Sequence, residues 1–224
     1  ARCRDCGHVF VQNPPSWDAL FAQYQGMACF EANYGPQGIH SLEDDTQWAG
    51  WLQQRLGRLR QCVFDEMPGG RLLRIVEVGC LEGRLVAELA ALGHAACGCD
   101  PNAEVATRGR EAFGVDIRAG TAATCFNGQG GYDLLLAFHV LHFVACPQET
   151  LASWVRLLRP GGRALVEVPL GRDDYDYRLC LQYFGRNSLE TLAKTFFSDH
   201  DLRLDSYVAG NDKSAQLGVL IGVR

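Results

Sequence analysis

The residues with the clearest chemical pattern are the seven from Glu77 to Gly83, which read E-V-G-C-L-E-G. A β-rich run over residues 72–78 leads into them, and Gly83 opens a leucine-rich amphipathic run of helical period. A strand that passes through a glycine turn into a helix is the first unit of a doubly wound α/β sheet. Ligands of such sheets bind beyond the carboxyl ends of the strands. The turn therefore predicts a ligand site.

The side chains around this turn favour a cationic ligand without phosphate groups. A dinucleotide fingerprint, G-x-G-x-x-G, sets bare backbone against a pyrophosphate, and this turn lacks the third glycine at that spacing. Glu77 and Glu82 also place carboxylates where a phosphate would be repelled. Asp100 ends the next predicted strand, where an acidic side chain can accept hydrogen bonds from both ribose hydroxyls of a nucleoside. A nicotinamide oxidoreductase is therefore disfavoured.

Two histidines, His139 and His142, follow the predicted strand over residues 132–138 and are the candidate catalytic bases. An imidazole with its ordinary pKa of about 6.5 is suited to removing a proton at neutral pH. For His139 the alternative is a positional role, such as hydrogen bonding to the backbone or shaping a pocket. For His142 we expect a solvated helix residue in preference to catalysis.

The N-terminal segment carries Cys3 and Cys6 in the arrangement C-x-x-C-G, which is typical of a zinc knuckle. A structural zinc site needs four ligands, and the sequence contains no second C-x-x-C motif. We expect half of a zinc ribbon, with Cys3 and Cys6 as possible zinc ligands. The alternatives are a bare reduced thiol pair and a metal site completed by His8 and Cys29.

The elements that must position these residues alternate between strands and helices after the Pro68-Gly69-Gly70 linker, which indicates a parallel sheet. Asn13-Pro14-Pro15-Ser16 breaks the chain before the predicted N-terminal helices. The predicted strands are 72–78, 95–99, 115–118, 132–138, 163–168 and an antiparallel pair at 202–208 and 216–223. The predicted helices are 45–66, 102–113, one that starts at Pro147 and one capped by Ser188.

The composition describes an ordinary globular chain of 224 residues, 47% hydrophobic and 21% charged. A net charge of −5 argues against a dedicated nucleic-acid binder, which usually carries a basic surface. The longest apolar stretch, residues 134–145, is too short to span a bilayer, and the N-terminus has no signal-peptide pattern. We therefore expect a soluble protein of a reducing cytoplasm with free cysteines and no membrane partner.

Four motifs in one order and spacing resemble those of class I S-adenosylmethionine-dependent methyltransferases: V-E-V-G-C-L-E-G, C-G-C-D-P, Y-D-L-L-L-A-F-H-V-L and L-L-R-P-G-G-R-A-L-V-E-V-P. The likeness covers residues 3–169 and is strongest to bacterial small-molecule methyltransferases with an N-terminal zinc ribbon. It implies a Rossmann-like, doubly wound, mostly parallel seven-stranded sheet. We divide the chain into a partial zinc-ribbon knuckle (1–14), an N-terminal helical cap (15–70) and a Rossmann-like methyltransferase domain (71–224).

The resemblance also implies how S-adenosylmethionine would be bound. The glycine turn would surround its methionine part, Asp100 would bind the ribose hydroxyls, and Tyr34 would close over the cofactor from the N-terminal segment. Phe138 and His139 would face the sulfonium and the methyl acceptor. The complete expected set is Tyr34, Glu77, Gly79, Cys80, Leu81, Gly83, Asp100, Pro101 beside the adenine, Thr121 and Ala122 near its amino group, Phe138 and His139.

Two departures from the family pattern bear on activity. Leu81 stands where the family usually has glycine, and its side chain could crowd the cofactor or push the turn outward. The pair His142-Phe143 replaces the usual Glu-His, which moves the histidine one position early. The predicted function is methyl transfer from S-adenosylmethionine to a small polar metabolite, such as a sugar or a natural-product intermediate. The alternative is a methyltransferase-like protein whose activity is lost or depends on a partner.

The segment 171–178 follows the fifth predicted strand on the acceptor side and contains three aspartates, two tyrosines and two arginines. It is either a lid that selects a polar or cationic acceptor or a solvated connection, because loops in this place often carry specificity.

Overall fold

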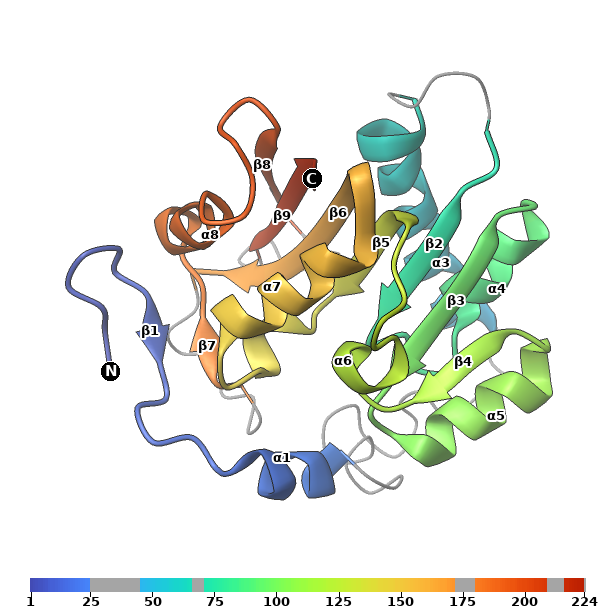
Figure 1. Ribbon diagram of the computed structural model, residues 1–224, viewed down its shortest axis with the longest axis horizontal. Helices are drawn as coiled ribbons and strands as arrows, with labels where there is room; N and C mark the ends of the chain where they lie inside the picture. Colours follow the sequence, from blue (N-terminus) through green and yellow to red (C-terminus); the bar gives the residue numbers. More distant parts are fainter. Residues whose placement is uncertain (25–44, 66–70, 172–179, 209–215, 224) are drawn as a thin grey trace.

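The computed structural model describes residues 1–24, 45–65, 71–171, 180–208 and 216–223 (Figure 1). Its main element is a sheet of seven strands: β2 (Arg74–Val78), β3 (Ala95–Asp100), β4 (Asp116–Ala119), β5 (Tyr132–Phe138), β6 (Leu158–Leu170), β8 (Leu202–Val208) and β9 (Gln216–Val223). The strand order is β4-β3-β2-β5-β6-β9-β8.

The strands from β2 to β6 pair in parallel, whereas β9 runs antiparallel to both β6 and β8. The predicted mostly parallel seven-stranded sheet and its closing antiparallel pair are therefore confirmed. From β2 the chain moves outward through β3 to β4, and it then returns to the other side of β2 as β5. The switch point between β2 and β5 is where ligands bind in sheets of this kind.

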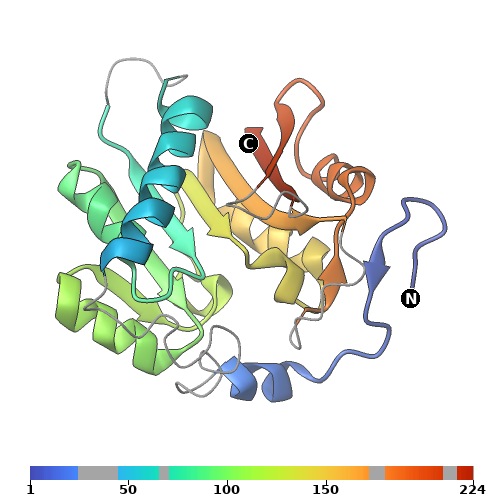
Figure 2. The same ribbon diagram turned by 180° about the vertical axis from the view of Figure 1, so that it is seen from behind.

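Helices cover both faces of this sheet. On one face lie α3 (Asp45–Leu59), the π-helical turn η1 (Arg60–Phe64) and α4 (Arg84–Ala91), as Figure 2 shows for α3. On the other face, α7 (Pro147–Leu157) and α8 (Arg186–Ala193) pack against the sheet. The remaining described elements are β1 (Val9–Phe10), α1 (Trp17–Tyr24), α5 (Ala103–Phe113), α6 (Ala122–Cys125), η3 (Leu141–Phe143) and β7 (Gln182–Tyr183).

Strand β5 shows why the sheet is covered on both sides, since all of its residues are buried. Leu135 and Ala137 belong to the core under α7, while Leu134 and Leu136 belong to the core under α3 and α4. A strand with apolar side chains on both faces is stable only between two layers. None of the helices in the described ranges is long and apolar enough to cross a membrane.

Most element boundaries lie within two residues of the sequence prediction, and three elements differ from it in kind or by more. Strand β6 begins at Leu158, because Leu158 pairs with Tyr132 and a register shift in the ladder absorbs the residues predicted as a turn. The predicted helix over 45–66 changes from α to π geometry at Arg60. Gly185, not Ser188, is the N-cap of α8, and the Ser188 hydroxyl accepts a hydrogen bond from the Gly185 N–H at 3.0 Å.

The N-terminal segment is attached to the C-terminal part of the chain by the antiparallel pair β1–β7. Next to it, the His8 ring lies 2.9 Å from Gln182 Oε1 through Nε2 and 3.3 Å from Ser188 Oγ through Nδ1. Both ring nitrogens of His8 thus have protein partners. These contacts and the β1–β7 pair hold the segment against the domain.

The expected zinc site is not supported. Cys3 and Cys6 lie on one turn with Gly7 in a left-handed conformation, as a knuckle requires. Within the described ranges, however, no group of three or more histidine, cysteine or acidic side chains could hold a metal ion. His8 is engaged elsewhere, and Cys29 lies outside the described residues. Two thiols alone do not fit a structural zinc ion, which takes four ligands.

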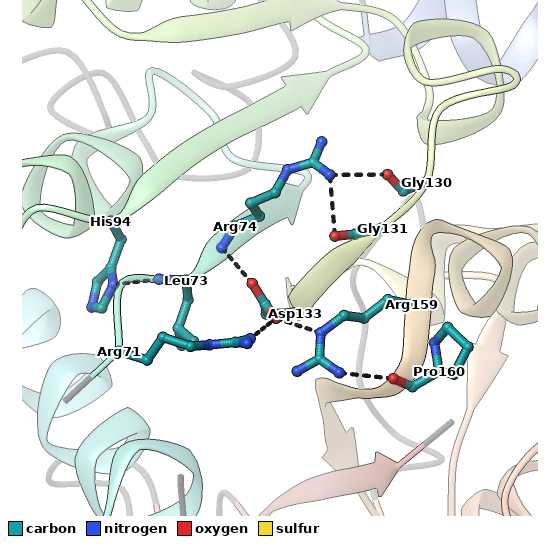
Figure 3. A network of polar contacts seen from close by, with 9 residues as sticks. All are labelled: Arg71, Leu73, Arg74, His94, Gly130, Gly131, Asp133, Arg159 and Pro160. Carbon is teal, nitrogen blue, oxygen red and sulfur yellow. Dashed lines mark hydrogen bonds and ion pairs between the residues drawn. The ribbon is translucent and has the colours of Figure 1, made fainter. Parts of the chain in front are cut away.

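At the amino ends of β2 and β5, the buried carboxylate of Asp133 gathers three donors (Figure 3). Its Oδ2 accepts from the main-chain N–H of Arg74 at 2.8 Å, and its Oδ1 accepts from Arg159 Nε at 2.5 Å and from Arg71. Burial by itself raises the pKa of Asp133, but the Arg74 hydrogen bond and the two guanidinium groups lower it overall. This cluster ties the sheet together at the end opposite the carboxyl edge.

Candidate active site

The parallel strands bring most of the predicted site residues to one edge of the sheet. The carboxyl ends of β2, β3, β4 and β5 lead into Gly79, Pro101, Gly120 and His139. Glu167 lies on β6 at the same level, because it pairs in register with Phe138. The switch point between β2 and β5 thus lies between the glycine turn and His139.

The middle residue of the glycine turn is Leu81, and it adopts a backbone conformation that favours glycine. Gly79, Leu81 and Gly83 have φ values of 70°, 52° and 76°, all in the left-handed region that favours glycine. The N–H groups of Gly79 and Cys80 donate to the carbonyl of Cys99 at 2.8 and 3.1 Å. Leu81 therefore holds the positive φ that glycine would adopt without strain, and whether its side chain crowds the cofactor stays a prediction.

Gly83 supports this path by close packing against β4. A Cβ atom at Gly83 would lie 2.2 Å from Cδ1 of Ile117, so a larger residue would force the buried Ile117 side chain to move. Cys80 is buried beneath the turn, and its sulfur would lie 2.6 Å from a Cβ at Gly98. Both residues shape the site through packing.

Asp100 is held beside the turn by two main-chain donors. Its Oδ2 accepts from the N–H of Leu81 at 2.9 Å and its Oδ1 from the N–H of Asn102 at 2.9 Å. Burial raises the pKa of Asp100 to about 6, although these two hydrogen bonds oppose the shift. Each carboxylate oxygen keeps a second lone pair, so the side chain can still accept hydrogen bonds from a ligand.

Glu77, at the end of β2, is a buried carboxyl group that is 2% exposed. Burial raises its pKa to about 8; the charge of Arg55 opposes the shift, while Asp100 and Glu82 add to it. Among the described residues, Oε2 of Glu77 has no hydrogen-bond partner. Burial also raises the pKa of Glu82, whose Oε1 lies 3.1 Å from Nε of Arg84.

These groups fit a cationic ligand. A buried carboxyl group with an unpartnered oxygen is stabilised by a cation or a donor placed beside it. S-adenosylmethionine offers an ammonium group, a sulfonium and ribose hydroxyls, and it has no phosphate. A pyrophosphate beside Glu77, Glu82 and Asp100 would oppose ionisation of these buried carboxyl groups, whereas a cation favours it.

Helix α3 contributes a buried arginine that sequence reasoning did not find. The guanidinium carbon of Arg55 lies 3.6 Å from the ring centre of Trp51 and 4.0 Å from that of Phe138. Arg60, which follows α3 in η1, is exposed, whereas Arg55 is buried. Trp51, one helical turn before Arg55, was a sequence signal for such a stack.

Phe138 contacts both the Arg55 guanidinium and the hydrophobic core. It is 4% exposed and packs in the cluster beneath α3. Its expected contact with the sulfonium stays a prediction.

His139 is joined to Glu167 at two points. The main-chain N–H of His139 donates to the Glu167 carbonyl at 2.9 Å, and Nε2 of the ring lies 3.0 Å from Glu167 Oε1. His139 also adopts the left-handed conformation, with φ of 57°. On the other side of Glu167, Nε of Arg58 lies 3.8 Å from Oε2. Glu167 is the glutamate of the motif L-L-R-P-G-G-R-A-L-V-E-V-P, but only the register between β5 and β6 places it beside His139.

His142 is buried within η3, so the expectation of a solvated helix residue is wrong. Its ring centre lies 3.9 Å from that of Phe143 and, edge to face, 6.0 Å from that of His139. Burial, and next the charge of His139, lower the pKa of His142 well below its ordinary value. His142 is therefore a neutral side chain at physiological pH.

The remaining predicted residues lie around the same edge. Thr121 caps α6, its Oγ1 accepting from the Thr124 N–H at 3.3 Å, and Ala122 is buried. Pro101 follows Asp100 directly and is half-buried. Tyr34 and all but the first residue of the 171–178 segment lie outside the described residues. The structure thus brings the turn, Asp100 and His139 to one edge, with Thr121 beside them after β4.

Known proteins resemble this chain in both sequence and fold. The tRNA 5-carboxymethoxyuridine methyltransferase of Escherichia coli K12 is 27% identical over 179 residues, which are 73% of this chain and 58% of the relative. The ubiquinone biosynthesis O-methyltransferase of Rhizobium rhizogenes is 33% identical over 95 residues, 40% of this chain and 38% of the relative. The chain thus spans less than two thirds of the length of these relatives.

Two solved structures show the same fold over nearly the whole chain. Magnesium protoporphyrin IX methyltransferase of Synechocystis, with bound S-adenosylmethionine, has a TM-score of 0.66 at 13% identity and covers 96% of this chain and 99% of its own. The 1,6-didemethyltoxoflavin-N1-methyltransferase of Burkholderia thailandensis, with bound S-adenosylhomocysteine, has a TM-score of 0.62 at 18% identity, covering 99% and 96%. Residues 76–166 match the model of the methyltransferase domain family.

Proposed function

We propose that this chain transfers the methyl group of S-adenosylmethionine to a small polar acceptor. The observation that carries the proposal is the buried acidic edge of the glycine turn, where Glu77 has an unpartnered oxygen and Asp100 lies one strand away. Such an edge suits an ammonium and two ribose hydroxyls. When bound, the cofactor supplies a methyl group on a positively charged sulfur.

In this proposal the residues of the chain have distinct roles. Glu77 and the turn bind the methionine part, with Gly79, Cys80, Leu81 and Gly83 lining it. Asp100 accepts from the ribose, and Pro101, Thr121 and Ala122 surround the adenine. Phe138 and His139 face the acceptor. Together, these residues contribute mainly by aligning the acceptor with the methyl carbon and by excluding water.

The kind of acceptor is inferred from the net charge of the chain and from the proteins that resemble it. A net charge of −5 disfavours a polyanion such as RNA, because phosphate contacts normally need a basic surface. One relative is named for a tRNA base and another for ubiquinone biosynthesis, and a structural neighbour holds a small heterocycle. We favour a small polar metabolite, such as a sugar or a natural-product intermediate.

The alternative function is a methyltransferase-like protein whose activity is lost or depends on a partner. The departure that supports it is Leu81, a side chain in the place of glycine. Its left-handed backbone and its bond to Asp100 argue for a working turn, because a degenerate site has no need to hold leucine in this conformation.

The test is a calorimetric titration of the purified protein with S-adenosylmethionine and, separately, with NADH. We expect micromolar binding of S-adenosylmethionine alone, and weaker binding by Glu77→Gln, which removes the acid that faces the ammonium. Binding of NADH alone, or of neither ligand, would contradict the proposal. Candidate acceptors are then screened by the formation of S-adenosylhomocysteine.

For the N-terminal part, we propose that residues 15–70 form a helical cap on the methyltransferase domain at 71–224, with Tyr34 closing over the cofactor. For Cys3 and Cys6 we propose a reduced thiol pair in this chain, because the described residues do not complete a zinc site. Measurement of zinc in the purified protein tests this: one equivalent of bound zinc would contradict it.

A further inference from the structure

We propose that Glu167 is a positioning residue that sets the tautomer of His139, so that Nδ1 of His139 accepts a proton from the methyl acceptor. This inference rests on the proposed function. It assigns the acceptor to the chemical class whose reacting oxygen or nitrogen carries a proton, such as an alcohol, a phenol or an ammonium.

The geometry that supports this proposal comes from two neighbouring strands. Phe138 pairs in register with Glu167, so His139, the next residue, leaves β5 directly beside Glu167. The ring nitrogen Nε2 lies 3.0 Å from Glu167 Oε1. An ionised carboxylate only accepts hydrogen bonds, so Nε2 carries the hydrogen and Nδ1 keeps its lone pair. Nδ1 is then the basic atom of the ring.

Glu167 is also held in place. It is 1% exposed, its carbonyl accepts from the His139 N–H at 2.9 Å, and its second oxygen lies 3.8 Å from Nε of Arg58. A guanidinium on one side favours the ionised form of a buried carboxylate, which the arrangement requires. The side chain of His139 is 35% exposed, so its ring can be reached from outside while Glu167 cannot.

The backbone of His139 supports the same conclusion. Its φ of 57° lies in the left-handed region, which a side chain-bearing residue adopts at a cost of about 1–3 kcal/mol. Such strain persists where the surroundings hold it and is concentrated at functional sites. The hydrogen bond to the Glu167 carbonyl holds this conformation and keeps the ring next to the carboxylate.

His142 cannot take this part. It is 2% exposed, and its ring centre lies 3.9 Å from that of Phe143 and 6.0 Å from that of His139. A methyl acceptor can reach the exposed part of the His139 ring, whose Nε2 is already bound to Glu167. It cannot reach the ring of His142, which is buried. Of the two predicted bases, the geometry selects His139.

With an alcohol as the acceptor, the proton of its O–H group moves to Nδ1 of His139 while its oxygen forms a bond to the methyl carbon. The bond from that carbon to sulfur breaks, and both of its electrons stay on sulfur. The products are the methyl ether, S-adenosylhomocysteine and a positively charged imidazole that is stabilised by Glu167. An acceptor atom without a proton would gain nothing from this pair.

The test is ¹⁵N NMR of the ligand-free protein labelled at histidine, which reports the protonation of each ring nitrogen. His139 is assigned by the signals lost in His139→Gln. At pH 7.5 we expect the Nε2–H tautomer in the wild type. Glu167→Met removes the acceptor but keeps the length of the side chain, and we expect it to abolish this preference. Glu190→Gln, at an exposed carboxylate paired with Lys194, is the matched control and leaves the signals unchanged.

Three results would overturn the inference: an Nδ1–H tautomer in the wild type, a doubly protonated ring, or an unchanged tautomer in a folded Glu167→Met protein. The first two need no variant, so the inference stays testable if Glu167→Met does not fold. A parallel titration with S-adenosylmethionine separates the two proposals. Cofactor binding with the wrong tautomer rejects only the positioning role, and the expected tautomer without cofactor binding rejects only the proposed function.

Discussion

The main-chain N–H of Leu81 donates to the carboxylate of Asp100 across a distance of 2.9 Å. This bond joins the middle of the glycine turn to the end of the neighbouring strand, and it forms because Leu81 adopts a left-handed conformation. The residue type departs from the family pattern, but Leu81 holds a positive φ that glycine adopts readily. The predictions for Leu81 therefore treat its backbone and its side chain separately.

We predict that Leu81→Gly raises the free energy of unfolding by up to about 1 kcal/mol, because glycine adopts a positive φ without the steric cost that leucine has. The gain is limited by the greater freedom of glycine in the unfolded chain. Urea unfolding measures the change. Leu81→Ala keeps a Cβ atom in the same conformation and is the control, for which we expect no gain.

The same variant tests whether Leu81 obstructs the cofactor. Because Leu81 already holds a positive φ that glycine can adopt, we expect the affinity of Leu81→Gly for S-adenosylmethionine to stay within about tenfold of the wild type, or about 1.4 kcal/mol. Calorimetric titration measures it. A much larger gain would show that the leucine side chain crowds the site, and it would favour the alternative of lost activity.

Glu77 predicts a coupling between cofactor binding and proton release. Its pKa of about 8 means that most of the carboxyl groups are protonated at pH 7 in the ligand-free protein. A cation bound beside Glu77 favours the ionised form, so binding should release a proton. Titrations at pH 7 in buffers of different ionisation enthalpy count that proton. Glu77→Gln should release fewer protons, whereas equal release by both proteins would assign the proton to another group.

Glu77 also predicts how the stability of the ligand-free protein depends on pH. Its pKa is raised on folding, from an ordinary value of 4.5 to about 8, so the folded state holds a proton that the unfolded state has lost between these values. Stability should therefore fall as the pH rises through this range. In urea unfolding, Glu77→Gln should gain stability relative to the wild type at pH 8 and lose most of that gain near pH 4.5. A difference in unfolding free energy between the two proteins that does not change with pH would contradict the raised pKa of Glu77.

The order of the elements could be predicted from the sequence because hydrophobic runs and glycine turns are local signals. The strand of residues 132–138 is apolar throughout, and this pattern already implied burial on both faces. The glycine turn and Asp100 could also be predicted from local signals, because each directly follows or ends a predicted strand. These positions needed no tertiary information.

The contacts of the site could not be predicted in this way. Glu167 reaches His139 only through the register of β5 and β6, and Arg55 reaches Phe138 only because α3 packs on that face of the sheet. His142 was expected to be a solvated helix residue, and the packing of η3 buries it. Pairings between segments far apart in the chain leave no local pattern.

Cys125 is predicted to be an unusually reactive thiol. A hydrogen bond from Cys99 lowers its pKa to about 7, whereas burial raises that of Cys180 to about 11. Because the thiolate is the reactive form, iodoacetamide at pH 7.5 should modify half-buried Cys125 well before Cys180, which peptide mass spectrometry resolves over time. Cys99→Ala removes the donor and should slow the reaction. Equal rates in both proteins would show that Cys99 has no part in it.

Asp133 predicts a loss of stability that depends on pH. Asp133→Asn leaves the guanidinium groups of Arg71 and Arg159 without their shared carboxylate, and we expect it to destabilise the protein at pH 7 by about 2 kcal/mol or more. The pKa of Asp133 is lowered on folding, so its contribution is full above the unfolded pKa and is lost as the pH falls through the folded one. The difference in unfolding free energy between the two proteins should therefore shrink in acid. Asp116→Asn, at an exposed carboxylate paired with Arg118, is the control and should change stability by no more than about 0.5 kcal/mol. A loss that stays constant from pH 7 down to pH values near 3, well below the ordinary aspartate pKa of 3.8, would show that packing, and not the charge of Asp133, holds this end of the sheet together.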